Sequence, residues 1–374
     1  PSPPPSPLAQ LDQRFLGGTA VLQRKKAVTV WGSGQSGAKL SLHLGGEQVA
    51  DAAVDSNGRW EAHLPPQPHA FNRTLAVVAN GATTSSAVVS FGEVLLCGGQ
   101  SNMQMTVCQQ FRADNGTAEC AAAGRYTAGI ALSGNVQNST GFWTRVTPSA
   151  LVSFSAICWY TGKALFDHLK GEVPFGLIAN PIGATAIEQW VPASAIDVCK
   201  PMLYPQGSRE WNEFNRSYKY SGLWRTNVEW LFPNTIGAMI WDQAESDVQC
   251  HPPTAADPVG LGPYSCLQAQ LIRAWRAGFS GGDWPFVAVQ LPGFELFTPP
   301  PDAWFRMRLA QANLSGVANT AIVPTYDLSC SSEYCHGPGP PYGEFHPTDK
   351  QDVAKRLALQ IRRMLFNESV VATG

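Results

Sequence analysis

The sequence predicts a mixed α/β protein, in which a parallel sheet with helices on both faces follows a small all-β domain. Two patterns predict this class. From residue 91 onward, short apolar stretches alternate with longer helical patterns, which is typical of a parallel sheet covered by helices. Before that point, short alternating or β-branched stretches recur at intervals of 8 to 15 residues, separated by turn residues, as in a β-sandwich. The composition fits a folded chain, because 44% of the 374 residues are hydrophobic.

We expect three regions along the chain: a Pro-rich extended leader at 1–14, a β-sandwich at 15–90 and a larger α/β domain at 91–374. The predicted strands of the sandwich lie at 28–30, 40–44, 60–64 and 74–78. Because no flexible linker separates Val88 from Glu93, we expect the two domains to pack as one rigid unit.

The larger domain supplies the alternation of strands and helices. Its predicted strands lie at 93–97, 175–179, 235–241, 285–291 and 320–326, and its predicted helices lie at 153–170, 267–277, 303–312 and 348–366. The last helix has capping-box spacing between Thr348 and Gln351. Its apolar residues fall on one face, as in a helix that packs on a sheet.

The charge balance and the lengths of the apolar runs bear on two classes of partner, nucleic acids and membranes. The chain has 26 basic and 28 acidic residues, so no polybasic surface is expected to hold a nucleic acid. No run of 18 apolar residues occurs, so we expect no membrane span. The 12 tryptophans are a high count, a bias often met in proteins that stack aromatic rings on sugars.

Sequons and cysteines indicate the secretory pathway. Six Asn-x-Ser/Thr sequons are candidate glycosylation sites, at Asn72, Asn115, Asn138, Asn215, Asn313 and Asn367. The nine cysteines include no C-x-x-C spacing, so we expect disulfides and no metal site. The pairings predicted from local spacing are Cys108–Cys120, Cys330–Cys335 and Cys250–Cys266, with Cys97 as a free buried thiol.

Four polar segments follow the predicted strands, at the edge where ligands bind in an open α/β sheet. These segments are 97–103, 179–185, 241–247 and, beyond the last strand, 343–347. In that order they contain a hydroxyl on a glycine turn, a backbone N–H beside a glycine, a side-chain amide, and an imidazole next to a carboxylate. Together these groups are the parts of an acyl-transfer site.

Three of these segments resemble a known family. The motifs Gly99-Gln-Ser-Asn-Met103, Trp241-x-Gln-x-Glu-Ser246 and Phe345-His-Pro-x-Asp-Lys-Gln351 are similar to those of the sialate O-acetylesterases within the SGNH hydrolases. The resemblance implies an SGNH-type three-layer α/β/α sandwich and a secreted or lysosomal serine esterase. It also implies an acetyl-serine intermediate, acetylated carbohydrate as substrate, and no metal or organic cofactor.

The resemblance assigns two catalytic roles. Ser101 matches the nucleophile, and the alternative is a serine that only caps a helix. His346 matches the general base, which the reaction needs because a serine hydroxyl is weakly nucleophilic at neutral pH. The alternative is a surface histidine before a helix, and His336 is the reserve candidate.

The oxyanion donors are expected to be the N–H of Gly183 and the carboxamide of Gln243. The alternatives are a simple turn glycine at the first position and a buried amide that holds its loop at the second. We expect Glu245 to be a structural carboxylate and Asn102 to brace the nucleophile turn.

The acid that orients His346 is expected to be Glu344, with Asp327 as the alternative. The general SGNH pattern has Asp three residues before the histidine, where this chain has Gly343. Asp242 stands where the family more often has Tyr, a departure that affects substrate fit.

The preferred substrate class is 9-O-acetylated sialic acid. Acetylated xylan or another plant or algal polysaccharide is the alternative within the same chemistry. A glycan-binding pseudoenzyme is the alternative from a different class, and the presence of Ser101, Gln243 and His346 argues against it.

Overall fold

One long strand, β8 (Ala82–Gly99), connects the two parts of the molecule. Its first half alternates between exposed and buried residues, whereas its residues from Phe91 to Gly99 are all buried. Alternation is typical of an antiparallel strand with one wet face, and continuous burial is typical of a strand covered on both faces. Accordingly, β8 pairs antiparallel with β7 (Ala70–Ala79) in its first half, and parallel with β11 (Phe175–Pro181) and β12 (Ala238–Asp242) in its second.

The computed structural model describes residues 8–107, 113–134, 142–199, 202, 220–250, 262–280, 282–293, 302–314, 316–328 and 346–372. Within these ranges the fold is mixed α/β, as the sequence predicts: an 11-stranded mixed sheet with helices, and a 3-stranded sheet. Among the described residues, no helix is both long enough and apolar enough to cross a membrane.

The N-terminal part is built of strands from both sheets. The 3-stranded sheet has the antiparallel order β1 (Ala9–Leu11), β3 (Val28–Gly34) and β6 (Arg59–Leu64). The large sheet contributes β2 (Ala20–Gln23), β4 (Lys39–Leu44), β5 (Glu47–Ala53), β7 and the first half of β8. β1 lies within the region 1–14 that the sequence predicts as an extended leader.

The second part continues the large sheet in the order β10-β9-β11-β8-β12-β13-β14. The strands not yet introduced are β9 (Ile130–Gly134), β10 (Thr144–Arg145), β13 (Phe286–Val289) and β14 (Thr320–Val323). All neighbours in this row are parallel except β10, which pairs antiparallel with β9. The five strands predicted after residue 91 each overlap an observed strand, whereas β9 has no counterpart in the prediction.

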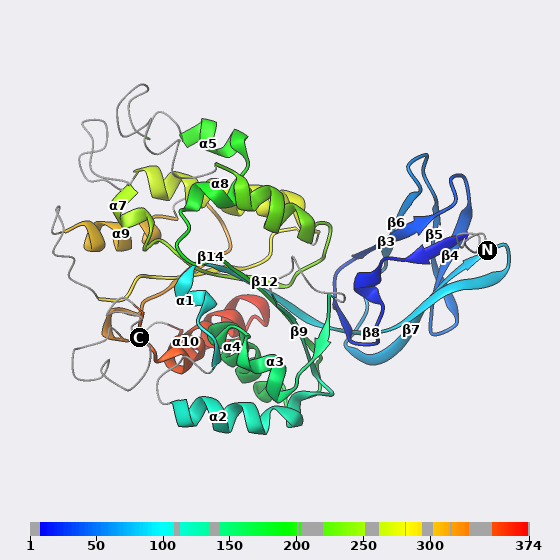
Figure 1. The fold of residues 1–374 in the computed structure, drawn as a ribbon, viewed down its shortest axis with the longest axis horizontal. Helices are drawn as coiled ribbons and strands as arrows, with labels where there is room; N and C mark the ends of the chain where they lie inside the picture. Colours follow the sequence, from blue (N-terminus) through cyan, green and yellow to red (C-terminus); the bar gives the residue numbers. More distant parts are fainter. Residues whose placement is uncertain are drawn as a thin grey trace, which may run out of the picture.

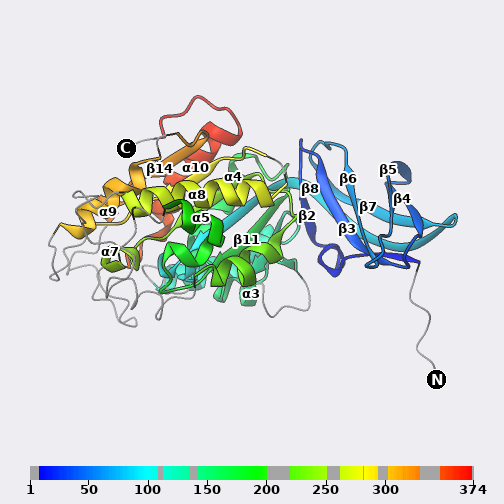
Figure 2. The same cartoon turned by 90° about the horizontal axis from the view of Figure 1, so that it is seen from above.

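Helices cover both faces of this sheet. Figure 1 shows α4 (Ala156–His168) and α10 (Lys350–Leu365) below the sheet, and α5 (Ala193–Cys199) and α8 (Gly262–Gly278) above it. The other α-helices in the described part of the chain are α1 (Ser101–Gln104), α2 (Ala113–Ala122), α3 (Pro148–Val152), α7 (Asp247–Cys250) and α9 (Ala303–Ala312). Figure 2, seen from above, shows the N-terminal strands projecting from one end of this layered part.

The core is divided by the sheet into two apolar clusters. Along β12, Ala238 and Ile240 belong to the cluster between the sheet and the helices α4 and α10. Met239 and Trp241 belong to the cluster between the sheet and α8. Tryptophans fill much of this core, and five of them rank among the largest fully buried side chains: Trp159, Trp190, Trp241, Trp275 and Trp284. Much of the high tryptophan count therefore reflects packing and not sugar contact.

One helix cap differs from the prediction, and a second helix has a cap that was not predicted. α10 begins at Lys350, and its cap is Asp349, whose Oδ1 accepts the N–H of Asp352 at 3.1 Å. The predicted capping box from Thr348 is therefore wrong by one residue, because the aspartate takes that place. α4 starts after Ser155, whose hydroxyl accepts the N–H of Cys158 at 3.2 Å.

The disulfides differ from the predicted pairings. The structure contains Cys97–Cys158 and Cys199–Cys266, each with Cα atoms 5.8 Å apart. The prediction of a free Cys97 is wrong because α4 packs on the sheet where β8 presents that thiol. The Cys250–Cys266 pairing is wrong as well, because α5 lies beside α8 and supplies Cys199. Cys108, Cys330 and Cys335 lie outside the described residues.

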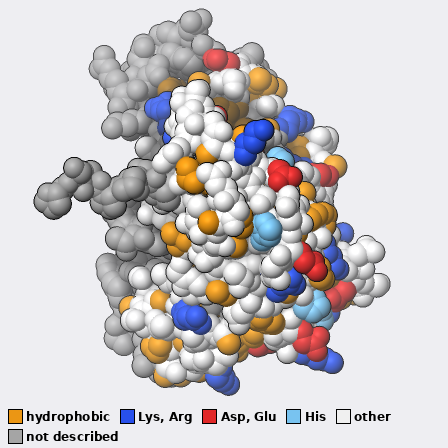
Figure 3. All heavy atoms as spheres, turned by 90° about the vertical axis from the view of Figure 1, so that its right-hand side faces the viewer, with side chains coloured by type: hydrophobic (Ala, Val, Ile, Leu, Met, Phe, Trp, Pro, Cys, Tyr) orange, Lys and Arg blue, Asp and Glu red, His pale blue; other side chains and the backbone are white. Residues whose placement is uncertain are grey.

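The surface of the N-terminal end has no concentration of one charge. Figure 3 shows basic and acidic side chains interspersed over this face, with apolar atoms in small separate spots. Among the sequon asparagines, Asn72, Asn313 and Asn367 are exposed. The side chains of Asn115, Asn138 and Asn215 lie outside the described part of the chain.

Candidate active site

The nucleophile turn is placed by close packing of β8 against β12. Gly99 ends β8 with φ +138°, and a Cβ on it would lie 2.0 Å from the carbonyl oxygen of Asp242, so only glycine fits here. The next residue, Gln100, donates its backbone N–H to that same carbonyl at 2.9 Å. α1 then begins with Ser101, which is half-buried at the carboxyl edge of the sheet.

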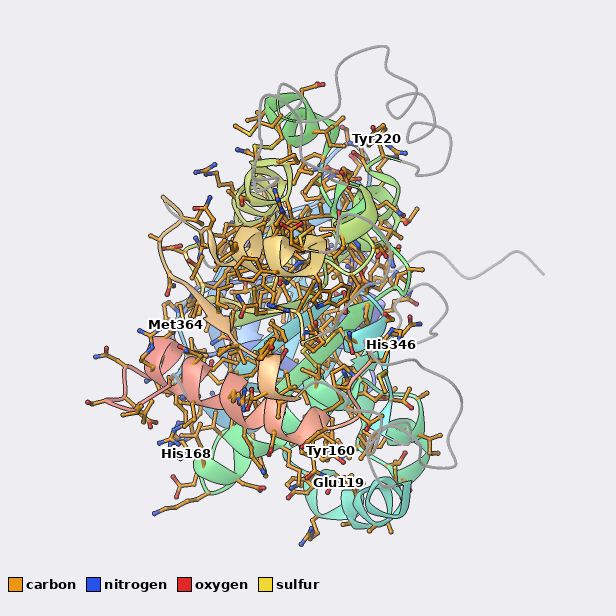
Figure 4. The ribbon with its side chains drawn as sticks, turned by 90° about the vertical axis from the view of Figure 1, so that its left-hand side faces the viewer. Glu119, Tyr160, His168, Tyr220, His346 and Met364 are labelled. Carbon is orange, nitrogen blue, oxygen red and sulfur yellow. A yellow bond between two sulfur atoms is a disulfide. The ribbon has the colours of Figure 1, made fainter. Side chains whose placement is uncertain are left out.

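Ser101 and His346 are brought together from opposite ends of the domain sequence. The Nε2 of His346 and the Oγ of Ser101 are 2.7 Å apart, although the residues are 245 positions apart in sequence. His346 is half-buried and precedes α10. Figure 4 views the molecule from the side to which the carboxyl ends of the strands point and labels this histidine. An imidazole at this distance can take the proton of the hydroxyl as the oxygen attacks an ester.

Gly183 lies beside the serine. A Cβ on Gly183 would be 3.6 Å from the Cβ of Ser101, so the loop after β11 runs along the nucleophile turn. The backbone of Ile182 donates to the carbonyl of Gly99 at 3.0 Å, which holds the loop there. The N–H of Gly183 donates to Oε1 of Gln104 at 2.7 Å, a contact that no motif in the sequence predicts.

Gln243 has a different environment from the predicted one. It is completely buried, and its Nε2 donates to the carbonyl of Thr185 at 2.9 Å, to Oε1 of Gln100 at 3.1 Å and to the carboxylate of Asp247. A carboxamide nitrogen has two hydrogens, so these acceptors already occupy its donors. The geometry therefore favours the alternative, a buried amide that holds the loops together, over the oxyanion assignment.

A buried charged cluster lies beneath the nucleophile turn. Lys350 donates to Oδ1 of Asn102 at 2.5 Å, and the amide of Asn102 donates to Oε1 of Glu245. Burial and the nearby Asp242 raise the pKa of Glu245 to about 8, and burial lowers the pKa of Lys350 to about 8. Burial also raises the pKa of Asp242 to about 6. Lys350 lies in the motif 345–351, but its residue type alone indicates no role there.

The two candidates for the histidine-orienting acid have different outcomes. Glu344 lies outside the described residues, as does the reserve histidine, His336. Asp327 is described, and both its oxygens accept hydrogen bonds from the guanidinium of Arg356, at 2.7 and 2.5 Å. Its carboxylate therefore serves a salt bridge to α10, so the geometry disfavours the Asp327 alternative.

A serine hydroxyl hydrogen-bonded to an imidazole, at the carboxyl edge of a sheet covered by helices, is the arrangement of a serine hydrolase. Among the described residues, no group of three or more His, Cys, Asp or Glu side chains is placed to hold a metal ion.

Comparisons with known proteins show which proteins this chain is similar to. The human sialate O-acetylesterase is 28% identical over 386 residues, covering 95% of this chain and 71% of its own. The sialate O-acetylesterase of Rattus norvegicus is 27% identical and covers 93% of this chain and 72% of its own. No family model matches the sequence.

A solved structure of a carbohydrate acetylesterase is also similar to this chain. A carbohydrate acetylesterase from Xanthomonas citri superposes with a TM-score of 0.77 at 25% identity, covering 97% of this chain and 77% of its own. The chain is thus similar over most of its length to proteins named sialate O-acetylesterase and to a carbohydrate acetylesterase of known structure, in agreement with the motifs around Ser101, Gln243 and His346.

Proposed function

We propose that the protein is a serine esterase that removes O-acetyl groups from carbohydrate hydroxyls. The observation that carries this proposal is the 2.7 Å contact between Ser101 Oγ and His346 Nε2, within a chain homologous to sialate O-acetylesterases. A pseudoenzyme that only binds glycans has no need to keep these two groups within proton-transfer distance.

The reaction follows from this geometry in two steps. The Oγ of Ser101 attacks the acetyl carbonyl while His346 takes its proton, and collapse of the tetrahedral intermediate expels the sugar oxygen, which receives that proton. Water then attacks the acetyl-serine with His346 as base, releasing acetate and restoring the hydroxyl. The N–H of Gly183 is the proposed donor to the oxyanion. In the structure this N–H donates to Gln104, so the exposed Gln104 side chain has to turn away when the oxyanion forms.

Glu344 is the proposed partner of the other ring nitrogen of His346. Two positions before the histidine, its carboxylate can fix the tautomer and stabilise the imidazolium. We expect Glu344→Gln to keep the fold and to lower kcat by orders of magnitude, whereas Asp327→Asn affects mainly stability. Circular dichroism and kcat for both variants provide the check. The reverse result would transfer the role to Asp327, and activity in both would indicate a dyad without a carboxylate.

The direct test of the function is acetate release by the wild-type chain and by Ser101→Ala, with Ser56→Ala as the matched control. Ser56 is exposed in a turn of the N-terminal part, so its hydroxyl has no role in the site. We expect the control to keep full activity and Ser101→Ala to lose nearly all of it. Carbohydrate binding without acetate release by the wild type would instead indicate the pseudoenzyme.

The proposed substrate is 9-O-acetylated sialic acid, supported by the relatives named sialate O-acetylesterase. Acetylated xylan and other acetylated polysaccharides are the alternative, supported by the broader name of the carbohydrate acetylesterase that superposes on this chain. Acetate release measured side by side on 9-O-acetylated sialic acid and on acetylated xylan decides between them. A higher kcat/KM on xylan would overturn the sialate assignment.

We also propose the finer fold assignment, an SGNH-type three-layer sandwich at 91–374 after a β-sandwich at 15–90. The parallel pairing of β9, β11, β8, β12, β13 and β14 supports the first part. Passage through the secretory pathway, to a secreted or lysosomal location, is supported by two disulfides and by exposed sequon asparagines. Removal of N-linked glycans from secreted material should shift its mass, and an unchanged mass would count against this route.

A further inference from the structure

Lys350 is buried with only 1% of its surface exposed, an unusual state for a lysine. Placing an ammonium group in the interior is costly unless partners compensate, so its position needs an explanation. Its Nζ donates to Oδ1 of Asn102 at 2.5 Å. The groups that face it are the acidic side chains of Asp242 at the end of β12, of Glu245 on the loop that follows, and of Asp349 in its own segment.

The hydrogen bond joins the two segments that supply the reacting side chains. Asn102 directly follows Ser101 on the nucleophile turn, and Lys350 lies four residues after His346 at the start of α10. These segments meet through the Ser101–His346 contact itself and through this second bond beneath it. The deeper bond is shielded from water, so it can fix the separation of the two segments before any substrate arrives.

The amide of Asn102 is held at both ends. Its oxygen accepts from Lys350, and its nitrogen donates to Glu245 on the loop after β12. An amide fixed by a cation on one side and a carboxyl group on the other has one orientation. A flip would turn its NH2 toward the ammonium group and its oxygen toward the carboxyl oxygen. The residue next to Ser101 is therefore clamped between α10 and β12.

We propose that Lys350, through Asn102, is a positioning residue that holds the Ser101 turn and the His346 segment at the separation required for proton transfer. The inference rests on the proposed esterase function and adds to it a residue that contacts neither the substrate nor the reacting atoms. Misplacing reacting groups by about 1 Å can cost about 10²-fold in rate. Loss of the clamp is therefore expected to lower kcat with little change in KM.

The test compares Lys350→Met with Lys355→Met on the same helix. Lys355 is an exposed lysine whose side chain retains 69% of its surface, and it contacts Asp352 at 2.6 Å. Both variants are assayed for acetate release and for the rate at which a fluorophosphonate probe labels Ser101. We expect Lys350→Met to lose about 10²-fold in kcat and in labelling rate, and Lys355→Met to stay within about twofold of the wild type.

Two further variants separate positioning from general stability. Glu245→Gln keeps an acceptor for Asn102, so we expect nearly full kcat. Lys350→Met combined with Glu245→Gln replaces both of the buried titratable groups that hold Asn102, and it is the version to assay if the single Lys350 variant does not fold. Its rate of labelling is expected to stay about 10²-fold low while its melting temperature recovers.

The two hypotheses fail in different measurements. A wild-type chain that neither reacts with the probe nor releases acetate would overturn the esterase function. The positioning role is overturned if the wild type is active and a folded Lys350→Met variant, single or combined, keeps wild-type kcat and labelling rate. It is also overturned if Lys350→Met changes only KM or only the melting temperature.

Discussion

At the scale of single residues, two amides near the nucleophile are hydrogen-bonded to buried neighbours. Gln243 and Asn102 both have the donor that an oxyanion requires, and the sequence motifs place both near Ser101. Sequence does not show what else surrounds a carboxamide. In the structure, Asp247, Thr185 and Gln100 occupy the donors of Gln243. The residue type therefore predicted a hydrogen-bond donor near Ser101, but the group to which that donor points depends on neighbours distant in sequence.

The first prediction concerns Gln243→Ala. The change removes a buried donor from Asp247 and from the carbonyl of Thr185, so we expect the free energy of unfolding to fall by about 1–3 kcal/mol. Urea denaturation measures this loss, with exposed Gln48→Ala on β5 as control. Unchanged stability together with a 10²-fold lower kcat would restore the oxyanion role.

The second prediction concerns pH and Glu245. Its folded-state pKa is raised from the ordinary 4.5 to about 8, chiefly by burial and then by Asp242. The folded chain therefore holds a proton that the unfolded chain releases, and stability falls as pH rises from about 4.5 to 8. Asp242 acts in the same direction below pH 6, whereas the lowered pKa of Lys350 makes stability rise again above pH 8.

Glu245→Gln removes the titration of one of these groups. We expect the decline in unfolding free energy between pH 5 and pH 8 to become shallower in this variant than in the wild type. Denaturation at several pH values checks the slope, and Glu47→Gln on exposed β5 is the control. Parallel curves for wild type and Glu245→Gln would show that this carboxyl group keeps its ordinary pKa in the folded chain.

At the scale of elements, the patterns that depend on local periodicity were the most predictable. The apolar stretches at 93–97 and 175–179 lie in β8 and β11, and the amphipathic pattern at 348–366 forms α10. β9 was missed because Ile130–Gly134 has only three apolar residues before a serine and a glycine. The free Cys97 and the Cys250–Cys266 pairing were mispredicted because local spacing does not show which helix packs over which strand or helix.

The third prediction follows from the Cys97–Cys158 bond, which ties α4 to β8 four residues before the nucleophile. The bond spans 61 residues, so chain-entropy reasoning gives about 4 kcal/mol of stabilisation. We expect Cys97→Ala combined with Cys158→Ala to lower the unfolding free energy by an amount of that order. Denaturation under non-reducing conditions measures it, and mass mapping should find the linked peptides only in the wild type. Separate peptides in the wild type would contradict the pairing.

At the scale of the whole molecule, the sequence anticipated two parts, but a side-chain network across their junction could not be foreseen. Gln23 ends β2 and Arg24 follows it, and both donate to the carboxylate of Glu93 in β8, at 2.8 and 2.6 Å. Farther along, the hydroxyls of Thr29 and Ser280 are 2.9 Å apart. These contacts connect the N-terminal strands to the part that contains Ser101.

The last prediction tests whether this junction makes the chain one cooperative unit. The side chains of Arg24 and Glu93 retain only 10% and 4% of their surface, so Glu93→Ala leaves a buried guanidinium without its carboxylate. Such a change typically costs about 3–5 kcal/mol. We expect calorimetry to show a single transition in the wild type and a clearly lower melting temperature in Glu93→Ala. Glu61→Ala is the control, because Glu61 is half exposed and its contact with His63 is 3.8 Å long. Two separate transitions in the wild type would show instead that the N-terminal strands unfold independently, and Glu93 would then stabilise only the junction.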